Sequence, residues 1–481
     1  AQNQGFQQAE AAAGRVTLHF TGQQMLKTVH AEDGVRLSQK KSQSGTGDLV
    51  MSSARSSAQS SALARTSSPT KGGAQDIEMT APVMDFIVKD GRRLELAETS
   101  GPPQIVITQS GSNQKTVVTA AKFTAKFTEK NRLAALHGEP DAKIVSSKMG
   151  MPAQPDRIST SQMLDVVFRP EGGVASITQT GSVTYVDSTL KASAQRGEYT
   201  AADQMLALSG SPRVLDNGMT TTAQTIRLNR ATGDAVAEGN VKSTYSDLKA
   251  QPDGAMLASA DPIHVTSRSM TAHRSPAVAV YTGDARLWQN ANVVEAPTLQ
   301  FDRDHRSLIA QGIPQGSMAQ PVSTVLVQVD KSGKATPVTI TSARLNYADV
   351  ERRIFLDGGV TAKGSDTTLT AQQMTVFLRS RSESQTAAGP ATPGQVERIV
   401  AEGKVVITQP TRHATGDRLV YTAAEDKFVL AGGSSGGSPS IFDAERGKIT
   451  GDSLTFYRHD DRVLVEGRET SPTVTRTQVA R

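Results

Sequence analysis

The chain is 481 residues long, with 37% apolar but only 4% aromatic residues, which suits a flat two-layer β structure better than a large conventional core. It has no cysteine, which excludes a disulfide scaffold and any metal site with cysteine ligands, and does not decide the cellular compartment. The net charge of +5 is a mild excess, compatible with a solvated surface or with binding phosphate-bearing ligands, and no apolar stretch approaches the roughly 18 to 20 residues of a membrane span.

The first 75 residues contain one incomplete β unit and one low-complexity stretch. Residue 1 is Ala and no signal peptide is present, so we expect a processed or cut N-terminus and a chain that is the later part of a longer one. Within residues 1–40, Val16–Phe20 reads as the end of one strand and Val29–Val35 as a second. Residues 41–75 are rich in Ser, Ala and Gly, which predicts a linker or an insertion.

From residue 76 onward an eight-residue pattern recurs. It begins with an apolar residue or Thr, then Ser or Thr, then a small residue and two positions of any kind. It ends with two apolar residues that are separated by one position of any kind. Self-similarity at a spacing of tens of residues is typical of a repeat protein whose units stack on their neighbours. We divide the repeats into two stacks, residues 76–255 and 256–475, followed by a basic tail at 476–481. Copies begin at Met79, Val118, Ala192, Thr221, Val265, Val294, Ile340, Leu369, Ala414 and Ile449, with a degenerate copy at Ser159.

The copy that shows the pattern most fully is Ile340–Thr361, ITSARLNYADVERRIFLDGGVT. Alternation from Ile340, resumed after a two-residue step at Leu345, predicts one half-buried strand, and the polar residues 348–352 predict a turn. The returning strand is interrupted at Gly358-Gly359, where a β-bulge is the usual reason for glycine inside a strand. Short, evenly spaced strands and the lack of a long amphipathic helix predict an all-β fold, although residues 7–13 are good local helix formers.

No catalytic or metal-binding motif stands out. The eight histidines never fall in a metal-ligand spacing, and His305, in FDRDHR beside Asp302 and Asp304, is more simply part of a turn. Hydrolase, dinucleotide and phosphate-loop motifs are missing, as are the basic clusters with aromatics that nucleic-acid binding would need. Acidic residues precede a recurring glycine, and their regular placement favours a solvent-face role over catalysis: Glu238, Asp357, Glu402 and Glu466. We therefore predict no enzyme activity, no cofactor and no metal.

The paired phrases TAQQMTVF with AEGKVVITQ, and TTAQTIRL with AVAEGNVKSTY, resemble the OstA-like (LptA–LptC type) family of bacterial lipopolysaccharide-transport proteins. The resemblance covers roughly residues 77–475, with a partial unit at 14–38. It implies a repetitive antiparallel β-jellyroll in which two sheets form an open V-shaped groove, shielding acyl chains of lipopolysaccharide on their way between the membranes. It also implies a periplasmic location, in which the protein is either soluble or membrane-associated through partners or through a missing N-terminal anchor.

Alternation predicts which side chains would line such a groove. If two half-apolar sheets face each other without closing, the recurrent apolar positions make a continuous trough. The alternative is a structural or adhesive β-repeat scaffold with a closed core and no lipid ligand. The predicted lining residues are Met84, Phe86, Phe123, Leu164, Val166, Ile226, Leu228, Met270, Leu299, Phe301, Leu345, Tyr347, Met374, Val376, Leu419, Tyr421, Leu454 and Phe456.

Stacked β units also end in strands with a free edge, which favours pairing with another protein of the same fold. The incomplete unit at Val16–Phe20 and the final strand Arg462–Gly467 are the expected pairing edges. The resemblance therefore implies two kinds of partner: lipopolysaccharide, and homologous jellyroll proteins of the transport bridge.

Overall fold

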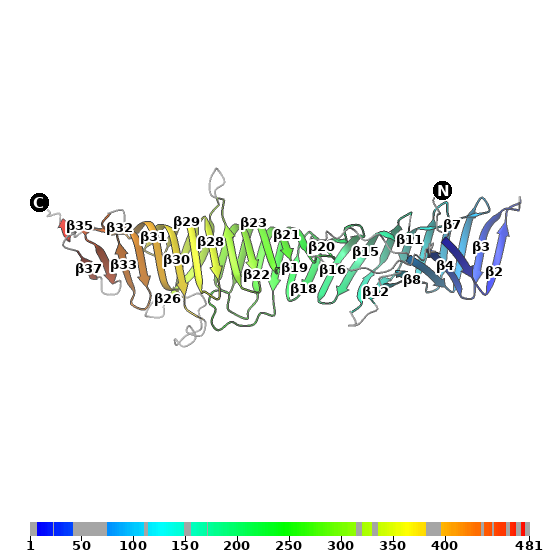
Figure 1. The fold of residues 1–481 in the computed structure, drawn as a ribbon, viewed down its shortest axis with the longest axis horizontal. Helices are drawn as coiled ribbons and strands as arrows, with labels where there is room; N and C mark the ends of the chain where they lie inside the picture. Colours follow the sequence, from blue (N-terminus) through cyan, green and yellow to red (C-terminus); the bar gives the residue numbers. More distant parts are fainter. Residues whose placement is uncertain are drawn as a thin grey trace, which may run out of the picture. The chain divides into compact units, whose positions relative to one another are not determined.

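The computed structural model describes residues 7–22, 24–41, 75–109, 114–148, 155–170, 172–313, 320–329, 335–380, 396–433, 437–444, 447–457, 462–467 and 473–476. The predicted linker at 41–75 and the predicted tail at 476–481 lie outside these residues, except for Lys41, Gln75 and Arg476. Every regular element in the described part is a β-strand, and every pairing is antiparallel, which confirms the all-β prediction (Figure 1). The chain divides into two compact units, residues 1–217 with 229–231, and residues 218–228 with 232–481.

In unit 1 the strands form two hydrogen-bonded ladders that share strands β15 (Val174–Asp187) and β16 (Leu190–Thr200). Ladder A contains β2 (Arg15–Phe20), β3 (Leu26–Glu32), β6 (Val83–Lys89), β7 (Arg93–Ser100), β10 (Lys122–Phe127), β11 (Leu133–Glu139), β14 (Met163–Phe168) and β17 (Met205–Ser209). Ladder B contains β1 (Gln7–Ala12), β4 (Val35–Lys41), β5 (Gln75–Ala81), β8 (Gln104–Gln109), β9 (Gln114–Thr119), β12 (Ala142–Lys148), β13 (Arg157–Ser161) and β18 (Arg213–Asp216).

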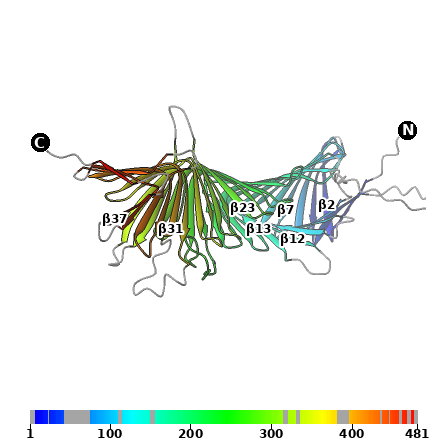
Figure 2. The same cartoon turned by 60° about the vertical axis from the view of Figure 1, so that its left-hand side comes forward.

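Unit 2 repeats this plan with more strands that cross from one ladder to the other. They form two runs of hydrogen-bonded neighbours, β21 to β24 and β29 to β32, and Figure 2 labels one strand of each run, β23 and β31. The crossing strands are β21 (Ala235–Tyr245), β22 (Ile263–His273), β23 (Val278–Gln289), β24 (Asn292–Asp302), β29 (Arg353–Lys363), β30 (Thr368–Leu378), β31 (Val396–Thr408) and β32 (Arg412–Thr422). Ladder A adds β20 (Thr225–Asn229), β25 (Ser307–Gln311), β28 (Arg344–Ala348), β33 (Lys427–Ala431), β36 (Ser453–Tyr457) and β37 (Arg462–Glu466). Ladder B adds β19 (Met219–Thr222), β26 (Val322–Val329), β27 (Ala335–Ser342), β34 (Ser440–Asp443), β35 (Gly447–Thr450) and β38 (Val474–Arg476).

The corner between the ladders is a β-bulge at which the chain takes two left-handed residues. In β29 these are Gly358 (φ 82°) and Gly359 (φ 86°), and the strand register shifts between Asp357 and Val360. A Cβ atom on Gly358 would lie 2.5 Å from the Cβ of Ala343, so only glycine fits there. The bulge predicted at this pair is confirmed. The same geometry recurs at Gly181-Ser182, Gly239-Asn240, Gly283-Asp284 and Gly403-Lys404.

The recurring pattern corresponds to a crossing between ladders, which corrects one prediction. The single strand expected from Ile340 to Tyr347 is two strands, β27 and β28, divided at Ala343. Ile340 pairs with Ala362 in ladder B, whereas Leu345 pairs with Leu356 in ladder A. Alternation specifies which face of a sheet a side chain occupies, but not which sheet the strand belongs to. The two-residue step between Ser342 and Leu345 is therefore the corner at which the chain passes from ladder B to ladder A.

Candidate functional site

The inner faces of the two ladders form the candidate site. All the predicted lining residues lie on ladder A of their unit, where successive strands present them on one face. All of them except Phe456 are buried. The structure thus brings them together as an apolar surface, while a role in contacting lipid stays a prediction.

The prediction omitted the opposing face, which ladder B supplies. In unit 1, Met79, Ile105 and Val118 of ladder B are buried in the same cluster as Met84 and Phe123 of ladder A. The sequence carried a signal for these residues, because most of them open a copy of the recurring pattern. In unit 2 the equivalent opening residues are buried except Ile449, which is half-buried: Thr221, Val265, Val294, Ile340, Leu369 and Ala414.

One section of unit 2 is filled by aromatic side chains that reach across from both ladders. The hydroxyl oxygens of Tyr245, on ladder B, and Tyr281, on ladder A, are 2.7 Å apart and share a hydrogen bond. The ring of Tyr245 also meets that of Phe301 edge-on, with centroids 4.9 Å apart. Burial raises the pKa of Tyr281 to about 12 and that of Tyr245 well above its usual range. The interior here is tightly closed.

A second section of unit 2 contains a cavity of about 370 Å³ between the ladders. Ile407, Ala414 and Ile441 line it from ladder B, and Phe428 and Phe456 line it from ladder A. Its volume falls in the range of about 300 to 1,000 Å³ that is usual for ligand pockets. Phe456, the predicted lining residue that is not buried, therefore borders an open space.

Exposed residues, most of them polar, border the opening of this cavity. Asp366, Pro410 and Thr411 are exposed and belong to its lining, so they mark the side that faces solvent. Arg412 lies among them, and its Nε donates a hydrogen bond of 2.9 Å to Asp443. An apolar interior with a polar, partly charged opening suits a molecule with a hydrocarbon part and a polar end.

A loop covers part of the groove of unit 2. Ser246–Pro262, here called the strap, joins β21 to β22, and its residues Ala255, Met256, Leu257 and Ala258 are at most 3% exposed. Figure 1 draws the strap as the green coil that follows β21. The prediction placed a domain boundary at 255–256, within the strap, and this boundary stays a prediction about folding units.

Ionic pairs lie on the outer face of ladder A in unit 1 and do not form a metal site. The Nδ1 atom of His30 lies 2.6 Å from Asp85, and that of His137 lies 2.7 Å from Asp165, so each hydrogen bond raises the pKa of its histidine. Both pairs join neighbouring strands of the ladder. Within the described residues, no group of three or more acidic or histidine side chains has the arrangement of a metal site.

The polar turn residues take the structural roles predicted for them. Asp302 accepts hydrogen bonds from the backbone amides of Asp304 and His305, at 2.9 and 3.0 Å, which confirms that FDRDHR is a turn. The acidic residues before the corner glycines also have structural roles on the solvent-exposed face. Glu238 pairs with Arg227 at 3.0 Å and Glu402 with Arg418 at 3.2 Å, both pairs exposed.

Two antiparallel ladders, joined along bulged corners and enclosing an apolar interior, define the class: a repetitive β-jellyroll with an internal groove. The chain matches a family described as "LptA/(LptD N-terminal domain) LPS transport protein" over residues 8–234 and 339–462. It belongs to this lipopolysaccharide-transport family. It is also 28% identical over 120 residues to an uncharacterized protein of Rhizobium meliloti (strain 1021), a match spanning 25% of this chain and 62% of that relative. The described residues contain no helix of the length and apolarity needed to traverse a membrane.

Proposed function

We propose that this protein is a non-enzymatic periplasmic bridge that binds lipopolysaccharide by its acyl chains between the two ladders. The cavity bordered by Phe428 and Phe456 carries the proposal, because it is an apolar space with a polar opening inside a chain of the transport family. At about 25 cal/mol per Å² of apolar surface removed from water, sheltering one acyl chain provides several kcal/mol. The free energy of binding is distributed over similar repeats, so lipid moves along the groove without being held tightly at one site.

Site-specific photocrosslinking in cells that make lipopolysaccharide tests the proposal. A probe at Phe456 lies at the cavity, a probe at Phe301 lies in the filled section, and a probe at Asn346 lies on the exposed outer face of β28. We expect a lipopolysaccharide adduct at Phe456 and none at Asn346. A folded protein that gives no adduct at Phe456 would support the alternative, a closed scaffold without a lipid ligand.

We also propose that the ladder edges bind homologous jellyroll proteins. In unit 1, Val16, Leu18 and Phe20 alternate along β2 on the same face as the core, yet they are 51%, 49% and 58% exposed. Within the described residues, β2 pairs only with β3, so the outer edge of β2 is available for strand addition. Among the described residues of unit 2, β37 likewise pairs only with β36 and has a similar edge.

Removing one edge tests this pairing. A chain truncated after Asp461 lacks β37 and β38. We expect it to lose photocrosslinks to a partner protein from a probe at Phe456 or Tyr457 while keeping those from a probe at Leu18 of the opposite edge. Association at that end that persists unchanged in the truncated chain would contradict edge pairing.

A further inference from the structure

The strap is held across the groove by side chains from both ladders. From ladder A, the Tyr347 hydroxyl accepts a hydrogen bond of 2.7 Å from the Met256 amide. One carboxylate oxygen of Asp349 accepts bonds of 3.2 Å from the amides of Ala255 and Leu257. Tyr347 is the second-last residue of β28 and Asp349 begins the turn after it, so the rim of ladder A binds three consecutive residues of the strap.

Ladder B holds the carbonyl groups of the same segment. The side-chain amide of Asn292 donates a hydrogen bond of 2.8 Å to the carbonyl of Met256. The side-chain amide of Gln289 donates to the carbonyls of Ser259 and Asp261, at 3.2 and 2.6 Å. These two anchors flank the turn between β23 and β24. The strap is therefore bridged to both rims through its backbone.

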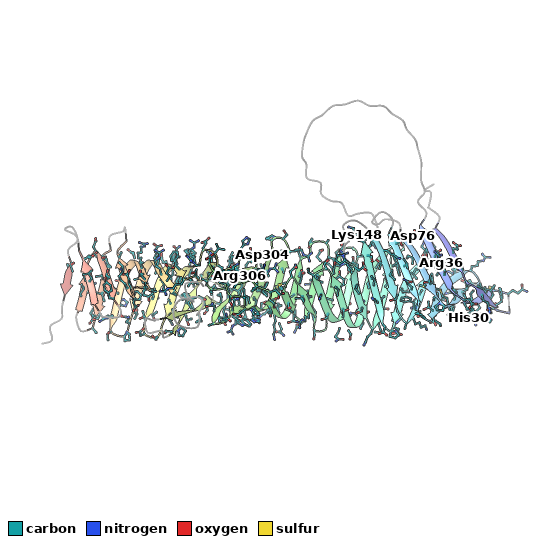
Figure 3. All side chains as sticks on the ribbon, turned by 90° about the horizontal axis from the view of Figure 1, so that it is seen from below. His30, Arg36, Asp76, Lys148, Asp304 and Arg306 are labelled. Carbon is teal, nitrogen blue, oxygen red and sulfur yellow. The ribbon has the colours of Figure 1, made fainter. Side chains whose placement is uncertain are left out.

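A buried arginine completes the set of anchors. Arg306, in the turn between β24 and β25, is 3% exposed and donates hydrogen bonds to the carbonyl groups of Leu257 and Ser259, at 2.6 and 3.2 Å. Figure 3 shows Arg306 over the ribbon, while Asp304 of the same turn stands at its margin. Asp349 is fully buried. Closing the strap therefore takes two ionisable side chains out of water, which is costly.

The closed strap also leaves hydrogen-bonding groups unmatched. In the described residues, four buried side-chain nitrogen or oxygen atoms lack a protein partner, and three belong to the anchors: Gln289 Oε1, Asn292 Oδ1 and Asp349 Oδ2. Each unsatisfied group opposes closure of the strap, whereas the burial of the Met256 and Leu257 side chains favours it. These unmatched groups offset part of what apolar burial and the anchoring hydrogen bonds contribute, which lowers the free energy needed to open the strap.

We propose that the strap is a gate that closes one section of the unit 2 groove and that an acyl chain displaces it. Residues 235–338, which include the strap, lie outside the ranges matched by the family. Met256 and Leu257 occupy the space between the rims with apolar side chains, as a hydrocarbon chain would. The identity of the displacing ligand rests on the proposed function, whereas the opening motion does not.

Hydrogen exchange on the whole chain without lipid tests the motion. We expect the amides of Ala255, Met256 and Leu257 to exchange by local opening, faster than the amides of β23 and β28. Asp349→Ala should accelerate this exchange about 10- to 100-fold, since bonds to a charged acceptor contribute about 1.5 to 3 kcal/mol. Asn346→Ala, on the outer face of β28, is the matched control and should change nothing. Strap amides that exchange only with global unfolding would overturn the gate.

A strapless variant tests what the gate controls. Tyr245 and Ile263 are paired across β21 and β22, so residues 246–262 can be replaced by a two-residue Asn-Gly turn without changing the register. We expect this variant to bind more of a fluorescent fatty acid per chain than the unaltered protein. Equal binding by both would overturn gating of the groove, and binding by neither would overturn the proposed function while the exchange result stands. If the strapless chain does not fold, Asp349→Ala serves in the same binding assay.

Discussion

Two sections of unit 2 share one backbone plan and differ in what fills the space between the ladders. Around Tyr281 the interior is occupied by aromatic rings, and the neighbouring strap is anchored to both rims. Around Phe456 a cavity remains between strands of the same type. The comparison shows that crossing strands and corner bulges build the walls, whereas side-chain volume and one inserted loop decide whether a section is closed or open.

The largest expected effect comes from removing an aromatic ring in each section. Phe301→Ala deletes a ring that is 1% exposed and should lower the free energy of unfolding by about 3 to 5 kcal/mol. Phe456→Ala enlarges a space that already exists and should cost much less, while weakening the binding of fatty acid. Denaturant-dependent hydrogen exchange of unit 2 measures the first quantity. Equal losses of stability would mean that the two sections are packed alike.

Substitutions at one corner test whether close packing, in addition to the left-handed backbone, requires glycine where the two ladders meet. Gly358→Ala places a Cβ atom 2.5 Å from that of Ala343, in addition to the cost of a left-handed φ, which together should exceed about 2 kcal/mol. Gly359→Ala is the matched control, because its φ is similar and nothing lies within 4 Å of its added Cβ. It should cost only about 1 kcal/mol. Thermal unfolding distinguishes the two, and equal costs would remove the steric explanation.

The tyrosine pair reports on how dry the filled section is. The pKa of Tyr281 is raised by burial from 10.0 to about 12, so the folded protein keeps this proton longer than the unfolded chain. This contribution to stability is complete below pH 10 and should be lost as the pH rises from 10 to 12. Ultraviolet titration of the phenol should show Tyr281 ionising late. Tyr281→Phe should cost about 1 to 3 kcal/mol, because it leaves the Tyr245 hydroxyl without this partner.

The smallest expected effect lies on the outer face of unit 1, away from either section. The pKa of His137 is raised mainly by its hydrogen bond to Asp165, so the pair stabilises the fold below pH 6.5. The stabilisation should disappear as the pH rises through the raised pKa of the folded protein. Asp165→Asn should lower that pKa in a proton NMR titration and leave fatty acid binding unchanged. An unchanged titration would show that the pair is not formed in solution.

The walls of the fold were predictable because alternation and glycine placement are local properties. Gly358-Gly359 was identified as a bulge from its position inside an apolar run, and the turn at 349–352 followed from polarity. Local propensity failed at residues 7–13, where good helix formers lie in β1, because pairing with β4 outweighs intrinsic preference.

Whether a section of the groove is covered, filled or open was not predictable, because this depends on contacts between residues that are distant in the sequence. Gly254–Ser259 has no apolar period and lies between prolines, so it reads as a boundary rather than as part of a buried segment. Its burial depends on Tyr347 and Asp349, about ninety positions further along the chain. Likewise, Phe301 and Phe456 hold the same position in the pattern, and only packing across the ladders distinguishes a filled interior from a cavity.

The crossing strands also give the protein a built-in unit of length. From Val265 to Val294, where two copies of the pattern begin 29 residues apart, the interval holds two crossing strands, β22 and β23. Neighbouring strands lie about 4.8 Å apart, so one such interval adds about 10 Å to both ladders at once. Gain or loss of such intervals would change the length of both ladders of a unit in steps of about 10 Å, because each added crossing strand brings its own copy of the corner.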